Sequence, residues 1–184
     1  IVVRLVGSEM CIRDRSLACY QGFVAFTTNR ERTLVVYEGS HKEHARYFES
    51  RGMGDGSSSW NKMPDEDVLA WADKKRVLEV QAGDLVLWDS RTFHQNQYGA
   101  PGSEERMVQY VCYLPKAGAG NTPAIQKKRR RYFETRRTTS HWPYPIRVNG
   151  LQPQTYGDDS VLIDYDALPT FDLSPWQAEI EKLI

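Results

Sequence analysis

The chain has 184 residues, of which 24 are Lys or Arg and 24 are Asp or Glu, so its formal net charge at pH 7 is zero. This length suits one domain with a sizeable core, and the balanced charge argues against nucleic acid or a membrane as a partner. No apolar run approaches the roughly 18 residues of a membrane span, and an odd number of cysteines favours reduced thiols and a cytoplasmic location.

The first fifteen residues differ in character from the rest of the chain. They join a short apolar run to the segment SEMCIRDR, and they match neither a signal peptide nor a clear strand or helix. The segment SEMCIRDR resembles the translated sequencing-adapter remnants found at the ends of conceptual translations. We therefore expect residues 1–15 to be non-native, the alternative being an ordinary N-terminal strand. The native domain then begins near Ser16.

Apolar runs bounded by polar turns predict five strands, at residues 17–28, 33–37, 76–81, 84–89 and 106–114. The polar turn at 29–31 predicts a hairpin between the first two strands. A polar Gly/Pro loop between the last two predicts another hairpin, which would bring His94 and Arg106 to the same end of one sheet.

Capping residues predict four helices. Ser40 can cap a helix over residues 41–50, and Pro64 opens one over 64–75 with acidic residues in its first turn. Thr122 and Pro123 start a helix over 124–137, and Ser174 and Pro175 open a last helix that runs to the end. The Pro/Gly-rich stretch at 141–159 has no period and predicts irregular chain.

This pattern predicts a mainly β fold, a double-stranded β-helix (jelly roll, cupin-like) with peripheral helices. Strands at this spacing, with helices at the periphery, do not suit alternating βαβ units. We expect an incomplete jelly-roll domain over residues 16–157, including a helix and the irregular segment. Residues 158–184 are expected to form a C-terminal tail that ends in a short helix.

His94 and Arg106 lie twelve residues apart, where one apolar run ends and another begins. A mononuclear non-haem Fe(II) site uses two His and one carboxylate on one face of the metal. Two of these ligands commonly form a His-x-Asp pair, because residues two apart on a strand point the same way, and a distant His is the third. An Arg about a dozen residues further on can bind the far carboxylate of 2-oxoglutarate bidentately. His94 and Arg106 fit the second half of such a site.

The segments LACYQGFVAF, LVVYEGSHKEH, GDLVLWDSRTFH and RMVQYVCYLP together resemble the phytanoyl-CoA dioxygenase family of Fe(II)/2-oxoglutarate-dependent oxygenases. The resemblance runs from about residue 17 to 106, and more loosely to 157. It implies that His94 is the distal iron ligand and that Arg106 anchors 2-oxoglutarate. It also implies that Asn96 is a second polar contact to the co-substrate and that Gln21 lies on a strand lining the pocket.

The chain departs from the family pattern at the His-x-Asp pair. That pair should precede the strand ACYQGFVAF by some fifteen residues. The expected positions correspond to Val3, Arg4 and Leu5. Two of the three iron ligands are therefore missing. We interpret the chain as an N-terminally truncated fragment whose authentic upstream strand has been replaced, and a natural pseudoenzyme is the alternative.

A second pair, His41-x-Glu43, formally matches His-x-acid. We reject it because the segment follows a capping turn and is expected to be helical, where residues two apart point about 200° apart around the axis. If the segment were a strand, the objection would fail. His41 and His44 could also chelate zinc, although solvated histidines at a helix start are the simpler interpretation.

The basic run at 127–131 raises the question of nucleic-acid binding. Because Ile125, Tyr132 and Phe133 predict an apolar stripe on the same helix, we interpret the basic residues as its solvated face.

The sequence thus predicts an Fe(II)/2-oxoglutarate-dependent dioxygenase that hydroxylates a small-molecule substrate, in a fragment expected to be inactive. A non-catalytic cupin-like binding module is the alternative, and a basic nucleic-acid-binding domain is third. The sequence specifies neither the substrate nor the oligomeric state.

Overall fold

The computed structural model describes residues 4–5, 19–52, 61–137, 139–144, 146, 160, 162, 164 and 166–184. The remainder of the predicted non-native segment and the predicted boundary at 157/158 lie outside these residues. The chain divides into two compact units, Ile1–Pro115 and Lys116–Ile184. No helix among the described residues has the length and apolar character needed to cross a membrane.

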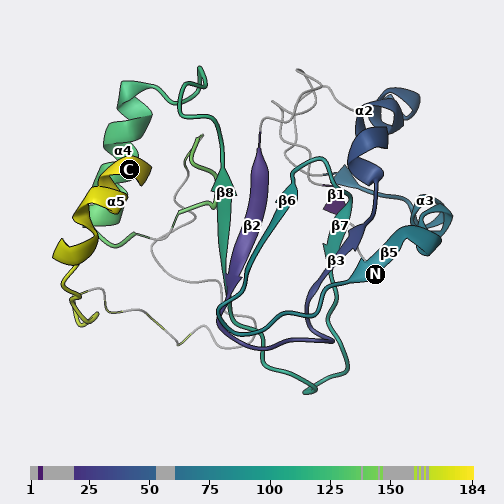
Figure 1. Cartoon of the computed structure of the whole chain (residues 1–184), viewed down its shortest axis with the longest axis horizontal. Coiled ribbons are helices and arrows are strands. Elements are labelled where there is room, and N and C mark those ends of the chain that lie inside the picture. The colour runs from purple at the N-terminus through teal and green to yellow at the C-terminus, as the bar shows by residue number, and fades with distance from the viewer. Residues whose placement is uncertain are drawn as a thin grey trace. The chain divides into compact units, whose positions relative to one another are not determined.

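The first unit contains two antiparallel sheets (Figure 1). The larger sheet has the strand order β4 (Asn61–Lys62), β1 (Arg4–Leu5), β7 (His94–Asn96), β3 (Leu34–Tyr37) and β5 (Lys75–Val77). The smaller sheet has the order β6 (Leu85–Asp89), β2 (Tyr20–Ala25) and β8 (Val108–Tyr113). A mainly β fold is therefore confirmed, and each of the five predicted runs overlaps a strand.

Both predicted hairpins are wrong. β2 and β3 belong to different sheets, and the polar turn between them crosses from one sheet to the other. β6 and β8 do not pair with each other, because both pair with β2. A polar turn between two apolar runs has the same local pattern in a hairpin and in a crossover, so tertiary contacts decide between them.

Alternating side chains divide the core into two clusters. The cluster between the sheets contains buried residues from β2, β3 and β6 together with Val80: Phe23, Ala25, Leu34, Val80 and Trp88. The cluster on the other face of the larger sheet contains Val35, Tyr37, Phe48, Met63 and Phe93. Each large apolar side chain buried in this way contributes about 1.5–3 kcal/mol.

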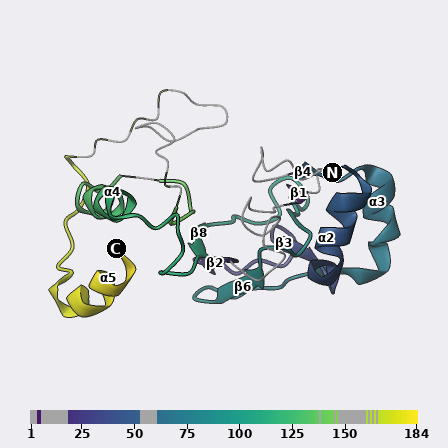
Figure 2. The same cartoon turned by 90° about the horizontal axis from the view of Figure 1, so that it is seen from above.

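Two helices cover the outer face of the larger sheet (Figure 2). They are α2 (Ser40–Ser50) and α3 (Asp65–Ala70), and a short 3-10 turn, η1 (Ala72–Lys74), follows α3. The predicted cap at Ser40 is wrong, because Gly39 with φ 77° precedes the helix. The Ser40 hydroxyl instead donates to the Tyr37 carbonyl at 2.6 Å and accepts the Phe93 amide at 2.8 Å, which ties α2 to the sheet.

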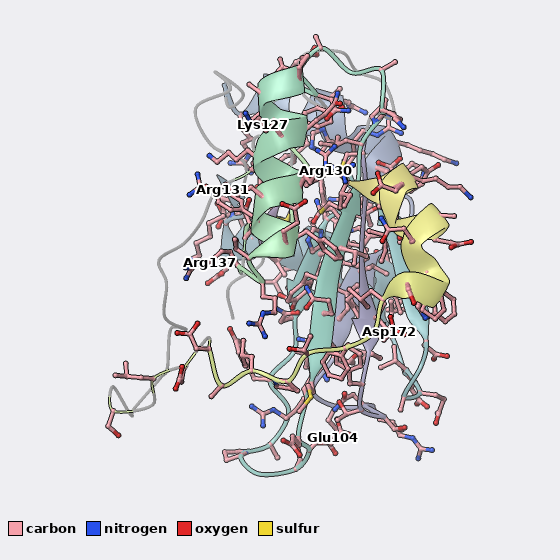
Figure 3. The ribbon with its side chains drawn as sticks, turned by 90° about the vertical axis from the view of Figure 1, so that its left-hand side faces the viewer. Glu104, Lys127, Arg130, Arg131, Arg137 and Asp172 are labelled. Carbon is pink, nitrogen blue, oxygen red and sulfur yellow. The ribbon has the colours of Figure 1, made fainter. Side chains whose placement is uncertain are left out.

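The second unit is built around α4 (Pro123–Glu134), η2 (Ser174–Trp176) and α5 (Gln177–Leu183). The Thr122 hydroxyl caps α4 by accepting the Ile125 amide at 3.3 Å, as predicted. Arg130 on α4 donates to both carboxylate oxygens of Glu181 on α5, at 3.0 and 2.6 Å. Figure 3 shows Lys127 and Arg131 on the other side of α4. Their side chains are exposed, as expected, but Phe133 is exposed too and does not extend an apolar stripe.

Candidate functional site

His94 opens β7 and is buried, with 7% of its surface exposed. It pairs with Val36 on β3, so it lies on the face of the larger sheet that meets β6, β2 and β8. Its Nδ1 lies 2.8 Å from the Thr92 carbonyl. Because a carbonyl can only accept, Nδ1 carries the proton and Nε2 is the nitrogen with a lone pair for a metal.

Arg106 lies just before β8 and points inward. Its guanidinium carbon is 5.4 Å from the centroid of the Phe23 ring and 6.0 Å from that of Tyr110. Nη1 donates to the Tyr110 hydroxyl at 3.3 Å, whereas Nε and Nη2 are buried with no hydrogen-bond partner among the described residues. A buried guanidinium with two unused donors is costly unless a ligand accepts from it.

A continuous set of side chains connects Arg106 to His94. The Tyr110 hydroxyl lies 3.5 Å from Oδ1 of Asn96, two residues after His94 on β7. On the other side, the Trp88 ring is 5.2 Å from the His94 ring and 6.2 Å from the Phe23 ring. The structure therefore brings His94, Asn96 and Arg106 to one region between the sheets.

Gln21 adds a further donor to this region. It is 4% exposed and pairs with Trp88 on one neighbouring strand and with Cys112 on the other. Its Nε2 and the Trp88 Nε1 are both buried without a hydrogen-bond partner among the described residues. With Arg106, they give the space between the sheets an excess of N–H donors, which suits an anionic ligand.

Trp88 and Tyr110 were not predicted as site residues. Both lie on apolar strands where an aromatic residue indicates core packing. Their alternation with Val86 and with Val108 and Cys112 placed them on the inner face. The sequence carried no signal for the unpaired indole nitrogen or for the contact between Tyr110 and Arg106.

The strand beside His94 is β1, and Arg4 pairs directly with His94. The family resemblance assigned the His-x-Asp pair to this stretch, which here carries neither His nor Asp. Across the described residues, no group of three or more His, Cys, Asp or Glu is placed to hold a metal ion. His41 and Glu43 lie on α2, so the geometric reason for rejecting that pair is confirmed.

His44 differs from its prediction as a solvated residue. It is 2% exposed, and its ring stacks on Phe48 with 4.5 Å between centroids. Burial, with a smaller contribution from the charge of Arg91, lowers the pKa of His44 to about 4. Cys19 is a buried free thiol and Cys112 a half-buried one, and Cys11 lies outside the described residues.

Comparison with known proteins finds one informative relative. The chain is 32% identical over 142 residues to Ava biosynthesis cluster protein O from Aspergillus versicolor. The aligned region covers 71% of this chain but 45% of that protein, so the chain spans less than half of its relative's length. No family model matches the chain, and no solved structure matches it.

Proposed function

We propose that the intact protein is an Fe(II)/2-oxoglutarate-dependent dioxygenase that hydroxylates a small molecule on a jelly-roll scaffold. The strand connections support the scaffold. The chain leaves β2 for β3 in the other sheet, returns at β6, crosses again to β7 and returns at β8. Repeated crossing between two packed antiparallel sheets is the pattern of a jelly roll.

The observation that carries the proposal is the Arg106 guanidinium, held between the sheets with Nε and Nη2 unpaired among the described residues. These two nitrogens lie on one edge of the planar fork, and a carboxylate accepts from such an edge bidentately. A carboxylate of 2-oxoglutarate therefore fits Arg106. Gln21 Nε2 and Trp88 Nε1 can donate to its remaining oxygens.

Iron fits this chain incompletely. His94 offers one ligand with a fixed tautomer, but β1 beside it supplies neither a second His nor a carboxylate. The described residues bind the dicarboxylate at Arg106, direct it toward His94 and surround it with Phe23, Trp88 and Tyr110, which exclude water.

The relative supports the substrate class. Its name assigns it to a biosynthesis cluster, which agrees with a reaction on a biosynthetic small molecule. A second candidate, a dicarboxylate-binding module without catalysis, is favoured by the lack of a three-ligand group among the described residues.

The first experiment measures binding of 2-oxoglutarate to the 184-residue chain by NMR titration. A single charged anchor without iron is expected to give a dissociation constant on the order of 1 mM. Arg106→Met should abolish the binding. Arg76→Met, which removes an exposed arginine paired with Glu38 at 3.1 Å, should not affect it. Equal binding by the Arg106→Met variant would refute the assignment.

The second experiment separates the two candidates. Succinate formation is measured with Fe(II), ascorbate and 2-oxoglutarate for the 184-residue chain and for a version carrying a native upstream strand with His-x-Asp. We expect succinate from the second protein alone, and none after His94→Ala. If the restored protein binds 2-oxoglutarate but forms no succinate, the binding module is the correct function.

A further inference from the structure

Arg106 is flanked by two backbone groups that are held by side chains from the turn between β2 and β3. Before it, the Glu105 carbonyl accepts a hydrogen bond of 2.7 Å from Nδ2 of Asn29. After it, the Met107 amide donates to the Thr27 hydroxyl at 2.9 Å. The peptide groups on both sides of Arg106 are therefore fixed by residues more than 70 positions earlier in the chain.

Thr27 and Asn29 are themselves joined and immobilised. The Thr27 hydroxyl donates to Oδ1 of Asn29 at 2.7 Å, so one chain of hydrogen bonds runs from Met107 through both side chains to Glu105. Asn29 is fully buried, and its backbone exchanges two hydrogen bonds of 3.0 Å with Val80. A buried, fully bonded Asn has little freedom to shift.

Glu104, two residues before Arg106, binds the same turn between β2 and β3. Its carboxylate accepts backbone amides of residues 30, 31 and 32 at 2.9–3.1 Å, and Asn29 Nδ2 at 3.2 Å. Successive amides that converge on one carboxylate form a strong anion-binding concavity, which the chain here fills with its own side chain. Figure 3 shows Glu104 in the loop at the end of the strands.

The guanidinium, in contrast, makes little use of hydrogen bonds. Its one hydrogen bond among the described residues, from Nη1 to the Tyr110 hydroxyl, is 3.3 Å long. The direction of the two unpaired nitrogens thus depends on where the backbone places Arg106, together with the Phe23 and Tyr110 rings that the guanidinium contacts. We propose that Thr27, Asn29 and Glu104 are positioning residues that aim the Arg106 guanidinium at the co-substrate carboxylate. This inference rests on the proposed function for its ligand, but not for its geometry.

The test uses two isosteric substitutions, each with a matched neighbour in the 184-residue chain. Thr27→Val removes the bridging hydroxyl, Thr27→Ser restores it, and Thr28→Val removes an adjacent exposed hydroxyl that contacts Gln81 instead. Glu104→Gln removes the charge that the three amides surround. Glu105→Gln removes an exposed neighbouring charge whose side chain makes no hydrogen bond or ion pair with the described residues. The Arg106 Nε–H signal in 15N NMR reports the guanidinium directly, and 2-oxoglutarate titration reports its use.

We expect Thr27→Val and Glu104→Gln to move the Nε–H signal and to weaken 2-oxoglutarate binding about tenfold, as for the loss of a well-placed hydrogen bond. Thr27→Ser, Thr28→Val and Glu105→Gln should stay within about twofold of the parent chain. If Thr27→Val does not fold, Glu104→Gln decides alone.

The outcomes separate the two proposals. If the parent chain binds 2-oxoglutarate and both test variants leave the signal and the affinity unchanged, the positioning role is overturned while the function stands. If the signal moves in the test variants but 2-oxoglutarate does not bind the parent chain, the geometry is supported and the proposed ligand is wrong. If the control variants change affinity as much as the test variants, the effect is general destabilisation and the positioning role is overturned.

Discussion

The Arg106 guanidinium stacks over the ring of Phe23, with its central carbon 5.4 Å from the ring centroid. This contact lies in the core between the sheets, where a cation–π interaction is worth about 2 kcal/mol when desolvated. We predict that Phe23→Leu weakens 2-oxoglutarate binding about three- to tenfold, because the guanidinium loses the surface that orients it. NMR titration measures the change.

The matched control for this prediction is Phe48→Leu. Phe48 is as buried as Phe23, but it lies in the cluster between the larger sheet and α2. Both substitutions should lower the free energy of unfolding by about 1–2 kcal/mol, measured by urea denaturation. An equal loss of affinity in both variants would show that Phe23 acts through stability rather than through Arg106.

Trp88 carries a buried indole N–H with no acceptor among the described residues. Trp88→Phe therefore removes no hydrogen bond within the described protein, and we expect it to cost about 1–2 kcal/mol through packing alone. If this N–H donates to 2-oxoglutarate, affinity falls about tenfold as well, since bonds to charged groups contribute about 1.5–3 kcal/mol. Trp71→Phe, in the other cluster, is the control. Unchanged affinity after Trp88→Phe would remove Trp88 from the site.

The strands were predictable where the apolar pattern was strong. β2 and β8 are six residues long each and form the smaller sheet with β6. β7 was missed as a strand because its three residues are polar, and its pairing with β3 depends on tertiary contacts. The crossover at residues 26–33 has the local pattern of a hairpin, because the backbone hydrogen bonds between Asn29 and Val80 have no local sequence signature.

The candidate site was predictable in its residue types but not in its surroundings. The spacing of His94 and Arg106 pointed to both residues. The structure places both in the region between the sheets, His94 on the larger sheet and Arg106 just before β8 of the smaller one. The aromatic side chains that connect them could not be distinguished from ordinary core residues. Ser40 shows the same limit, because a residue with good capping chemistry bonds instead to Tyr37 and Phe93.

The bonds to Glu104 predict a response to acid. The backbone amides of Arg32 and Arg30, with Asn29, hold the pKa of Glu104 at about 2. The unfolded value is about 4.3. Because the folded pKa is the lower one, the stabilisation is complete above about pH 4.5 and is lost as pH falls toward 2. The Tm difference between the parent chain and Glu104→Gln should be constant from pH 8 to about 5 and shrink below it. A difference that persists unchanged at pH 2 would contradict this.

His44 predicts a second loss of stability on acidification, in a higher pH range than that of Glu104. Its pKa falls from 6.5 to about 4 because burial against Phe48 disfavours the charged ring. A lowered His pKa gives stability that is complete above about pH 6.5 and declines as pH falls toward 4. The full effect is about 3 kcal/mol at most. His44→Leu should flatten the pH dependence of urea denaturation in this window, whereas Phe23→Leu, in the other core cluster, should lower stability equally at each pH.

β1 and β7 pair antiparallel with Arg4 directly opposite His94. Directly opposed positions share one face of a sheet, and so do positions two apart along a strand. The family resemblance placed the His-x-Asp pair at positions 3 and 5, one residue away from this register. A shift of one residue moves a strand's side chains to the opposite face. Position 4 is therefore the one that shares the face of His94.

We predict that Arg4→His creates a two-histidine metal site with His94. Co(II) binding, followed by calorimetry and by visible absorption, should be at least about tenfold tighter than in the parent chain, and His94→Ala should remove the gain. Leu5→His introduces the same ligand one position along β1 and should give no such gain, because neighbouring positions on a strand face opposite sides of the sheet. Because the two variants differ by one position on the same strand, tighter binding by the second would show that β1 pairs with β7 one residue out of the register described.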